Sequence, residues 1–290
     1  MRILLTGAEG QLGRCFSDRA GDSLEILATD RKQLDITDLQ AVEKVIDSFK
    51  PDAIVNAAAY TAVDKAESDY DTAYAINCEA VKNLTAEASR LNIPFIHVST
   101  DYVFNGESEI AYSESDSCDP QSVYGTTKRA GELEALKSPK GIVIRTSWVF
   151  SEYGNNFVKT MLRLGAQRDA LSIVGDQYGC PTYAGDLAQA ILKMLAASDF
   201  EPGLYHYSGD ESVSWYQFAQ KIFTTANASG LYPRVPILSS ITTEEYPTPA
   251  ARPRYSVMNT NKLNAMGITP GKWKKQLEAI IPKILNEIGV

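Results

Sequence analysis

Cysteine and histidine are scarce in this chain of 290 residues, which has four cysteines and two histidines. The cysteines are far apart, form no CxxC pair and have no histidine nearby; they are Cys15, Cys78, Cys118 and Cys180. Neither a zinc site nor a disulfide framework is therefore predicted. We expect free thiols in a reducing compartment, the cytoplasm.

Long apolar runs are also missing. No stretch approaches the roughly 20 apolar residues of a membrane-spanning helix. No charged segment precedes a long apolar run at the N-terminus, so we expect no signal peptide. The sequence shows no internal repeat and no low-complexity tail.

Basic residues are outnumbered, with 28 lysines and arginines against 36 aspartates and glutamates and a formal net charge of -8. Nonspecific binding to nucleic acid needs clustered basic side chains that neutralise phosphates, so this balance argues against it. Binding of an anionic small molecule is compatible with this charge balance, because such a ligand needs only a local basic patch.

Apolar residues make up 44% of the chain, and its length suits one large domain or one domain with a smaller lobe. In the first half, short apolar runs alternate with stretches of helical periodicity; the runs are residues 2–6, 24–28, 53–56, 95–98 and 141–146. Strands that are apolar throughout, with helices between them, predict an α/β fold with a parallel sheet covered on both faces.

The second half is less regular. Helices are predicted at about 155–164, 184–197, 215–225 and 272–288, and the Pro- and Thr-rich stretch 233–255 shows little periodicity. We assign residues 1–150 to the domain with the parallel sheet, to which 171–205 contribute a further strand and helix. Residues 151–170 and 206–290 mainly form a smaller lobe over the carboxyl ends of the strands, where open α/β sheets bind ligands.

Three glycines stand at the first strand-to-helix turn, Gly7, Gly10 and Gly13, with the spacing GxxGxxG. Glycine lets backbone N–H groups and a helix N-terminus approach a pyrophosphate, where the helix dipole favours negative charge. Any tight turn of this kind uses glycine, so the triplet alone is weak evidence for a nucleotide-binding site. Its place in the first βα unit, with an acidic residue ending the second strand, favours a dinucleotide-binding domain over residues 1–150.

That acidic residue is Asp30. A carboxylate at this position can accept hydrogen bonds from both ribose hydroxyls, which favours NAD. Arg31 and Lys32 follow at once and suit a ribose phosphate instead, and solvated loop charges are the third alternative. The choice between NADPH and NADH stays open at this point.

Two further segments follow strands. Asp35 and Ile36 lie where an acidic side chain can meet the amino group of adenine, although the segment taken alone fits a helix-capping region better. Ala57, Ala58 and Ala59 end the third strand with small side chains, against which a flat ring can lie or which simply pack well.

The stretch from Thr100 to Lys128 carries the chemistry. Thr100 and Asp101 follow the apolar strand at 95–98, and Tyr124 and Lys128, four apart, share one face of a predicted helix. A free tyrosine has a pKa near 10 and is a protonated donor at neutral pH, and a nearby ammonium lowers that pKa. Thr100 would hydrogen-bond the oxygen on which charge develops. A chance pair of a half-buried tyrosine and a solvated lysine is the alternative.

Three other positions invite both a functional and a structural explanation. Trp148 follows the strand at 141–146 and can stack on a ligand ring or fill the core. Arg252 and Arg254 are candidates for a basic patch that faces a diphosphate, or surface arginines in a loop. Asn77, on a largely apolar helix, suggests a buried hydrogen bond.

Together these motifs resemble the extended short-chain dehydrogenase/reductases that act on nucleotide sugars, and among them the dTDP-4-dehydrorhamnose reductases. The resemblance covers nearly the whole chain and is carried by residues 7–13, VNAAAYTAVDKAES (55–68), VSTDYVFNG (98–106), VYGTTKRAGE (123–132), TSWVF (146–150), GNNFVKTML (154–162), VGDQYGCPTYAGDLA (174–188) and RPRYSVMNTNKL (252–263). It implies a Rossmann-type doubly wound parallel sheet with a smaller C-terminal substrate-binding lobe.

The resemblance also implies roles for single residues. Tyr124 would be the proton donor, Lys128 its partner and Thr100 the hydroxyl that polarises the carbonyl. Cofactor contacts are implied at Gly10, Gln11, Leu12, Asp35, Ile36, Ala57, Ala58 and Ala59, and sugar contacts at Thr100, Asp101 and Trp148. From the residues themselves we add Gly7, Gly13, Asp30, Arg31, Tyr124 and Lys128 for the cofactor and Arg252 for the substrate.

Two positions depart from related enzymes. Nucleotide-sugar dehydratases carry an Asp-Glu pair after the threonine, whereas Tyr102 follows Asp101 here, so dehydration is not expected. Some reductases of this family have an acidic residue two positions after the third glycine, linked to a magnesium-dependent dimer. Cys15 stands there in this sequence, so no metal site is carried over.

The expected activity is reduction of the 4-keto group of dTDP-4-dehydro-6-deoxy-L-mannose to dTDP-L-rhamnose by NADPH or NADH. The alternatives are a reductase or an epimerase of another nucleotide sugar. A further alternative is a non-catalytic, cofactor-binding regulatory subunit similar to that of methionine adenosyltransferase. We expect a cytoplasmic protein whose partner is the nucleotide sugar, with neither nucleic acid nor membrane, and a homodimer is left open.

Overall fold

The computed structural model describes residues 1–197, 200–232 and 234–289. Its centre is a six-stranded sheet in the order β10-β5-β4-β3-β1-β2, in which every neighbouring pair is parallel. The strands are β1 (Arg2–Thr6), β2 (Glu25–Thr29), β3 (Ala53–Asn56), β4 (Phe95–Thr100), β5 (Gly141–Thr146) and β10 (Gly203–His206). The predicted α/β fold with a parallel sheet is confirmed.

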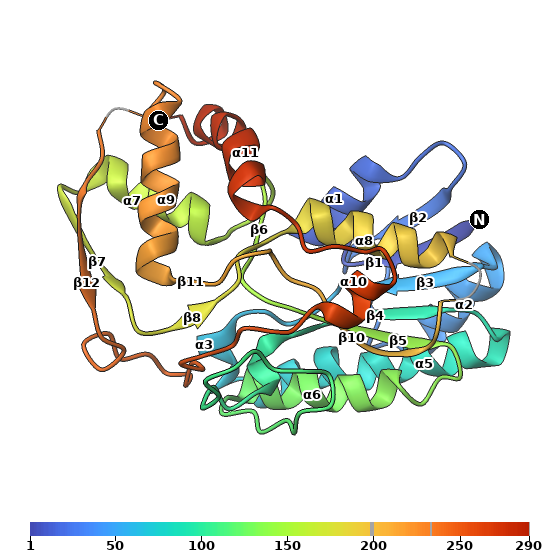
Figure 1. Ribbon diagram of the computed structural model, residues 1–290. Coiled ribbons are helices and arrows are strands. Elements are labelled where there is room, and N and C mark those ends of the chain that lie inside the picture. Colours follow the sequence, from blue (N-terminus) through green and yellow to red (C-terminus); the bar gives the residue numbers. More distant parts are fainter. Residues whose placement is uncertain (198–199, 233, 290) are drawn as a thin grey trace.

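Helices cover both faces of this sheet (Figure 1). They are α1 (Gln11–Arg19) and α8 (Ala184–Ala196) on one face, and α2 (Leu39–Phe49), α5 (Ala80–Leu91) and α6 (Val123–Ala135) on the other. Within β1, Ile3 and Leu5 belong to the core beneath α1 and α8, whereas Leu4 belongs to the core beneath α2 and α5. Successive side chains of a strand point to opposite faces, so a strand covered on both faces is apolar throughout.

The helical segment between residues 70 and 91 is interrupted. It runs as α4 (Tyr70–Tyr74), a π-helical turn (Ala75–Glu79) and α5, with the short α3 (Val63–Ala66) before it. Asn77 lies in the π-helical turn, accepts a hydrogen bond from the Tyr60 amide at 2.9 Å and donates to Thr127 Oγ1 at 3.1 Å. The predicted buried hydrogen bond is therefore present, and it ties the segment after β3 to α6.

The second half builds a smaller lobe around a core of its own. Phe218, Trp273 and Ile281 lie at the centre of this core. Its main elements are α7 (Phe157–Gln167), α9 (Trp215–Ala228), α11 (Trp273–Ile288) and the parallel pair β7 (Ala170–Val174) and β12 (Ile237–Ile241). The short pairs are β6 (Val149–Phe150) with β9 (Thr182–Tyr183) and β8 (Tyr178–Gly179) with β11 (Val213–Ser214), and α10 (Asn261–Ala265) contacts β10.

Two segments of the second half differ from simple expectation. β12 falls inside 233–255, where the sequence shows little periodicity, because this strand is partly polar and mostly exposed. The segment 171–205 is divided: β7 pairs with β12 in the lobe, while α8 packs on α1 and β10 extends the large sheet. The division of the chain into two domains stays a prediction.

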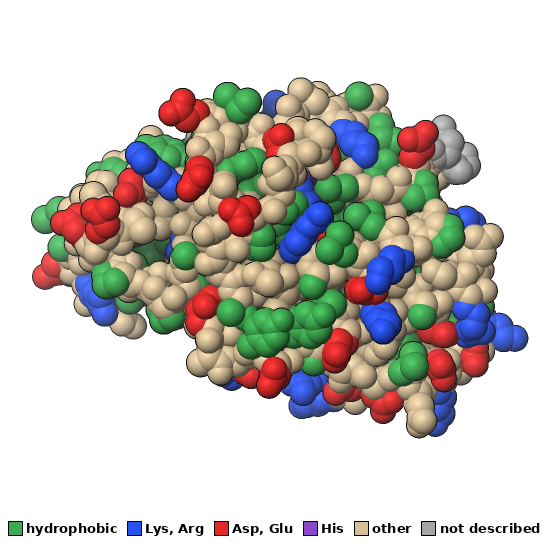
Figure 2. Space-filling view, turned by 90° about the horizontal axis from the view of Figure 1, so that it is seen from below, with side chains coloured by type: hydrophobic (Ala, Val, Ile, Leu, Met, Phe, Trp, Pro, Cys, Tyr) green, Lys and Arg blue, Asp and Glu red, His purple; other side chains and the backbone are tan. Residues whose placement is uncertain are grey.

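In the described ranges, none of the helices has both the length and the apolar character that crossing a bilayer demands. Acidic and basic side chains are interspersed over the face seen from below α5 and α6 (Figure 2). Such a mixed surface is unlike the basic stripe that nucleic acid would require.

Candidate active site

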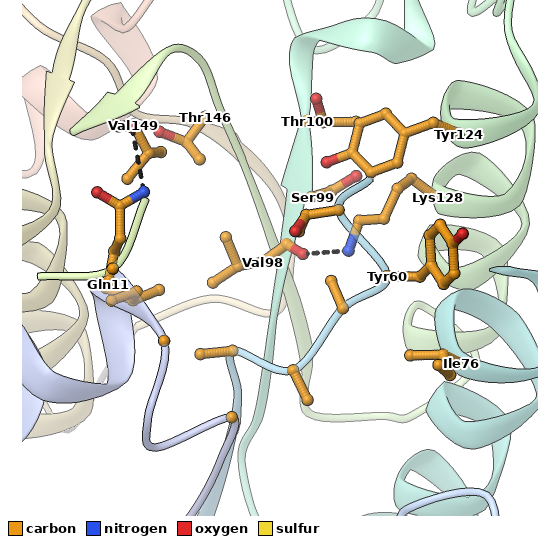
Figure 3. A pocket seen from close by; sticks show the side chains of 18 of the residues that line it. Gln11, Tyr60, Ile76, Val98, Ser99, Thr100, Tyr124, Lys128, Thr146 and Val149 are labelled. Atoms are coloured by element: carbon orange, nitrogen blue, oxygen red, sulfur yellow. Dashed lines mark hydrogen bonds between the residues drawn. The ribbon is translucent and has the colours of Figure 1, made fainter. Parts of the chain in front are cut away.

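A cavity of about 1000 Å³ opens at the carboxyl ends of β1, β3, β4 and β5. Its wall also includes the starts of α1 and α6 and residues of the smaller lobe (Figure 3). The predicted site residues on this wall are Gly7, Gly10, Gln11, Leu12, Asp30, Arg31, Asp35, Ile36, Ala57, Ala58, Ala59, Thr100, Asp101, Tyr124, Lys128 and Trp148. The fold thus brings together side chains that are up to 141 positions apart in sequence, from Gly7 to Trp148 (148 minus 7). Gly13 and Arg252 lie elsewhere.

The glycine turn after β1 is fitted closely to the end of β3. Gly7 has φ 73°, and a Cβ on it would lie 2.5 Å from the Ala58 nitrogen. Gly13 serves packing instead, since a Cβ there would lie 2.4 Å from the Gly7 carbonyl oxygen. α1 starts after Gly10 with no side chain capping its N–H groups and no acidic residue in its first turn. Uncapped N–H groups that face a cavity fit an anion such as a pyrophosphate.

The loop after β2 supplies the acidic and basic residues at one edge of the cavity. Asp30 accepts hydrogen bonds from the Lys32 and Gln33 amides at 2.8 and 2.9 Å, so part of its carboxylate is used in its own turn. Asp35 accepts from the Thr37 amide and hydroxyl, which lowers the pKa of this carboxyl group. Arg31 lines the cavity between them and is exposed.

β4 ends in a polar tip. The Thr100 hydroxyl donates to Asp101 Oδ1 at 3.1 Å and accepts from the Tyr102 amide at 3.2 Å, which starts a 3-10 turn at Asp101–Val103. Asp101 is 2% exposed, and burial raises its pKa to about 6. The carboxyl group therefore titrates near neutrality at the floor of the cavity.

α6 places the tyrosine and the lysine beside this tip. Ser122 caps the helix by accepting a hydrogen bond from the Gly125 amide at 3.1 Å. A Cβ on Gly125 would lie 2.2 Å from the Tyr102 carbonyl oxygen, so glycine allows α6 to pack directly on the turn after β4. Tyr124 in the first turn and Lys128 one turn later both project toward the end of β4 (Figure 3).

Lys128 is buried, with 2% of its surface exposed. Its Nζ donates to the Val98 carbonyl oxygen at 2.7 Å and lies 3.4 Å from His97 Nε2. Burial lowers the pKa of Lys128 to about 8, against the opposing effect of Glu132. An amine with this pKa is charged at neutral pH and gives up its proton more readily than an ordinary lysine.

The pKa of Tyr124 differs from the sequence-based expectation. We expected a nearby ammonium to lower it, whereas burial raises it to about 12, opposed by a hydrogen bond with Thr100. The reason is that the Lys128 ammonium is directed at Val98 and His97. Tyr124 is therefore a protonated hydroxyl over the whole physiological pH range, as a proton donor must be.

Trp148 lines the cavity at the boundary between sheet and lobe. Its backbone has φ 48°, an uncommon conformation for a bulky residue. The indole stacks on Trp215, which lines the same cavity from α9. The ring therefore packs against the lobe and also faces the cavity, and its stacking on a ligand ring stays a prediction.

Arg252 is not brought to this cavity. It forms an ion pair with Asp64 at 2.8 Å and lines a second hollow of about 630 Å³ together with Arg254 and Tyr178. Its guanidinium also donates to the Thr248 hydroxyl and to the Ala250 carbonyl oxygen. These contacts anchor the loop before α10 to α3.

Several residues on or beneath the wall were missed from sequence. Trp215 and Phe157 come from the lobe, and no motif marks them as neighbours of Thr100. Asn56 and His97 lie directly behind the wall and contact each other. A signal for these two does exist, since each is a polar residue that follows apolar residues within a buried strand.

The comparisons with known proteins agree with this geometry. The sequence model described as the RmlD substrate binding domain matches residues 1–286. The chain is 47% identical over 287 residues to a dTDP-4-dehydrorhamnose reductase of Aggregatibacter actinomycetemcomitans, covering 96% of this chain and 98% of that protein. The chain belongs to the RmlD substrate binding domain family.

Two further relatives extend the comparison. The spore coat polysaccharide biosynthesis protein SpsK of Bacillus subtilis (strain 168) is 40% identical over 278 residues, 95% of each chain. A crystal structure of a dTDP-4-dehydrorhamnose reductase from Bacillus anthracis str. Ames in complex with NADP superimposes with a TM-score of 0.91 at 38% identity, over 97% of this chain and 99% of that one. This chain therefore shares its fold with that reductase over nearly its whole length.

Proposed function

We propose that this protein is a dTDP-4-dehydrorhamnose reductase that reduces the 4-keto group of dTDP-4-dehydro-6-deoxy-L-mannose to dTDP-L-rhamnose. The observation that carries the proposal is the convergence of Thr100, Tyr124 and Lys128 on the cavity that also contains the glycine turn. The 47% identity to a protein of that name supports the choice of substrate.

NADPH is the proposed cofactor. The uncapped start of α1 at Gly10 fits its pyrophosphate, and Arg31 at the cavity edge fits a phosphate on the adenosine ribose. A related reductase was crystallised with NADP. The further residues proposed to hold the cofactor are Gln11, Leu12, Asp35, Ile36, Ala57, Ala58 and Ala59, all on the wall. When bound, NADPH supplies the hydride.

The chain itself supplies the proton and the position of the substrate. Tyr124 donates its hydroxyl proton to the carbonyl oxygen of the sugar as the hydride arrives at the carbon. The Thr100 hydroxyl hydrogen-bonds the same oxygen, where negative charge develops. Lys128 places a positive charge one helical turn from the tyrosinate that forms and stabilises it. Asp101 and Trp148 are proposed to face the sugar, since both line the cavity beside these groups.

The decisive test is the substitution Tyr124→Phe. Loss of a general acid costs about 10²- to 10⁴-fold in rate, so turnover should fall by that factor while NADPH still binds. The decrease in NADPH absorbance over time in the presence of the 4-keto sugar measures turnover, and a fluorescence titration measures cofactor binding. Tyr232→Phe is the control, because its buried hydroxyl donates to the Leu162 carbonyl oxygen in the lobe, away from the cavity.

Near-normal turnover of the Tyr124→Phe protein would show that another group is the acid. An epimerase would convert a nucleotide sugar without net oxidation of added NADPH, so the same absorbance trace distinguishes the two activities. We further propose that the enzyme acts in the cytoplasm, where its free thiols stay reduced. The homodimer stays a prediction that light scattering on the purified protein can measure.

A further inference from the structure

A row of buried polar side chains lies directly behind Lys128. Thr6, Asn56 and His97 come from the adjacent strands β1, β3 and β4, and they occupy directly paired positions in the sheet. Their exposed fractions are 1%, 0% and 0%. Polar groups buried this deeply need hydrogen-bond partners, because an unpaired one costs free energy in an apolar sheet.

The direction of these hydrogen bonds is set by a backbone group. The Ala58 amide, which can only donate, lies 3.1 Å from Asn56 Oδ1, and the Thr6 hydroxyl lies 2.7 Å from the same oxygen. The carboxamide orientation of Asn56 is thereby fixed, and its Nδ2 faces His97 Nδ1 at 3.1 Å. An amide nitrogen has only protons to offer, so His97 Nδ1 must accept.

The tautomer of His97 follows. Burial keeps the pKa of this imidazole well below its ordinary value, so the ring is neutral and carries one proton. Since Nδ1 accepts, that proton is on Nε2. Nε2 lies 3.4 Å from Lys128 Nζ. An ammonium has no lone pair to accept this proton, whereas a neutral amine has one.

We propose that His97 is a positioning residue for the reaction: held by Asn56 as the Nε2–H tautomer, it stabilises the neutral amine of Lys128 and so makes the ammonium a readier proton donor to the Tyr124 tyrosinate. The inference rests on the proposed function for its catalytic meaning. In the step, an N–H bond of the Lys128 ammonium breaks and solvent in the cavity carries the proton to Tyr124, where an O–H bond forms, because Nζ itself is directed at Val98 and His97. The amine left behind accepts the His97 proton in a hydrogen bond. Solvent returns a proton to Lys128 through the cavity.

The other charged and titratable groups around Lys128 do not remove this preference. Tyr124 and Glu132 share α6 with Lys128, Asp101 and Tyr102 line the same cavity, and Arg145 on β5 binds Glu132. Glu132 favours the ammonium, but both its oxygens are bound by the Arg145 guanidinium at 2.8 Å. Burial and the His97 N–H group therefore act together, in the direction of the lowered pKa of Lys128.

Nitrogen NMR tests the tautomer without any assay of activity. The chain has two histidines, so His206→Gln in uniformly ¹⁵N-labelled protein leaves only the His97 ring signals. We expect a protonated, pyrrole-like Nε2 and an unprotonated, pyridine-like Nδ1 between pH 6 and 9. A proton on Nδ1, or an imidazolium in this range, would overturn the proposal. Because no turnover is measured, this outcome is distinct from failure of the proposed reductase activity.

Asn56→Asp tests the effect on Lys128. The carboxylate keeps the acceptor for Thr6 and Ala58 and replaces the Nδ2 donor by a second acceptor, so His97 should move its proton to Nδ1. Nε2 then accepts a hydrogen bond from the Lys128 ammonium, so the pKa of Lys128 should rise by about one unit or more. The ¹³Cε chemical shift of Lys128 reports this pKa, and the Lys128→Met protein assigns the signal. The alkaline limb of kcat should move in the same direction.

The double variant Asn56→Asp/His97→Leu is the matched control for the added charge. It retains the carboxylate and lacks the imidazole, so its Lys128 pKa should rise less than in the single variant. An equal rise in both proteins would show that the carboxylate alone acts and would overturn the proposal. If either variant fails to fold, the tautomer measured in the His206→Gln protein still decides the question.

Discussion

Trp148 and Trp215 stack face to face, with ring centroids 3.5 Å apart and planes inclined by 6°. Trp148 follows β5 of the large sheet, whereas Trp215 is the first residue of α9 in the lobe. Phe157 of α7 packs against Trp215 with a centroid distance of 4.6 Å. The stack therefore joins the large sheet to the lobe at the wall of the cavity.

Trp215→Leu should loosen this wall. An aromatic pair contributes about 0.5–1.5 kcal/mol beyond its buried area, so KM for the nucleotide sugar should rise by about 2- to 13-fold while cofactor affinity stays unchanged. Steady-state kinetics and an NADPH fluorescence titration measure the two quantities. Trp273→Leu is the contrasting variant: its ring is buried in the lobe core, and it should lower stability instead of changing KM selectively.

The Glu132–Arg145 pair gives a prediction about stability. Both side chains are at most 1% exposed, and the guanidinium makes two bonds of 2.8 Å to the carboxylate. Removing one member of a buried pair leaves the other charge uncompensated, at a cost of about 3–5 kcal/mol. We expect Glu132→Gln to lower the free energy of unfolding in urea by this amount. Glu134→Gln, whose partner Lys137 is exposed, should change it by about 1 kcal/mol or less.

Local patterns in the sequence predicted the sheet because each of its first five strands is an apolar run with its own turn. They also predicted which residues meet at the cavity, since Gly7, Ala57 and Thr100 all follow such runs and parallel strands end at one edge. The strand β12 could not be found, because Ile237–Ile241 is partly polar and depends on β7 for its pairing.

Contacts between distant segments could not be predicted from local sequence patterns. Nothing near Trp215 in the sequence indicates that it stacks on Trp148, and nothing near Arg252 indicates that Asp64 binds it. The pKa of Tyr124 was predicted in the wrong direction for the same reason. A spacing of four places Lys128 on the same helical face, but the direction of its ammonium depends on Val98, on another strand.

The buried Asp101 predicts a pH dependence of stability. Its pKa is raised from 3.8 to about 6, so the folded chain binds this proton more tightly than the unfolded chain. The contribution of Asp101 is therefore most favourable below pH 4 and is lost as the pH rises to about 6, by about 1.4 kcal/mol for each pKa unit.

Replacing this side chain by Asp101→Asn should remove that dependence. The variant should be more stable than the parent protein by about 3 kcal/mol at pH 7 and equal to it near pH 4. Urea unfolding of both proteins between pH 4 and 7 measures the difference between their free energies of unfolding. The contributions of the other titrating groups cancel in this difference. A difference that stays constant over this range would mean that Asp101 is ionised throughout.

Arg31 should determine the choice between the two nicotinamide cofactors. Asp30 uses its Oδ1 atom within its own turn, and Arg31 lies exposed at the cavity edge. A charge-assisted hydrogen bond to a phosphate contributes about 1.5–3 kcal/mol, and the lower end applies to an exposed group. Arg31→Ala should therefore raise KM for NADPH about tenfold and leave KM for NADH nearly unchanged.

Lys32→Ala is the matched control, because this neighbour carries the same charge and does not contribute to the cavity wall. Its KM for NADPH should stay within about twofold of the parent value at an ionic strength near 0.15 M, where exposed charges beyond about 8 Å are screened. Equal losses in both variants would indicate that the general positive charge of the loop attracts the cofactor. A loss confined to Arg31→Ala would place the ribose phosphate at that guanidinium.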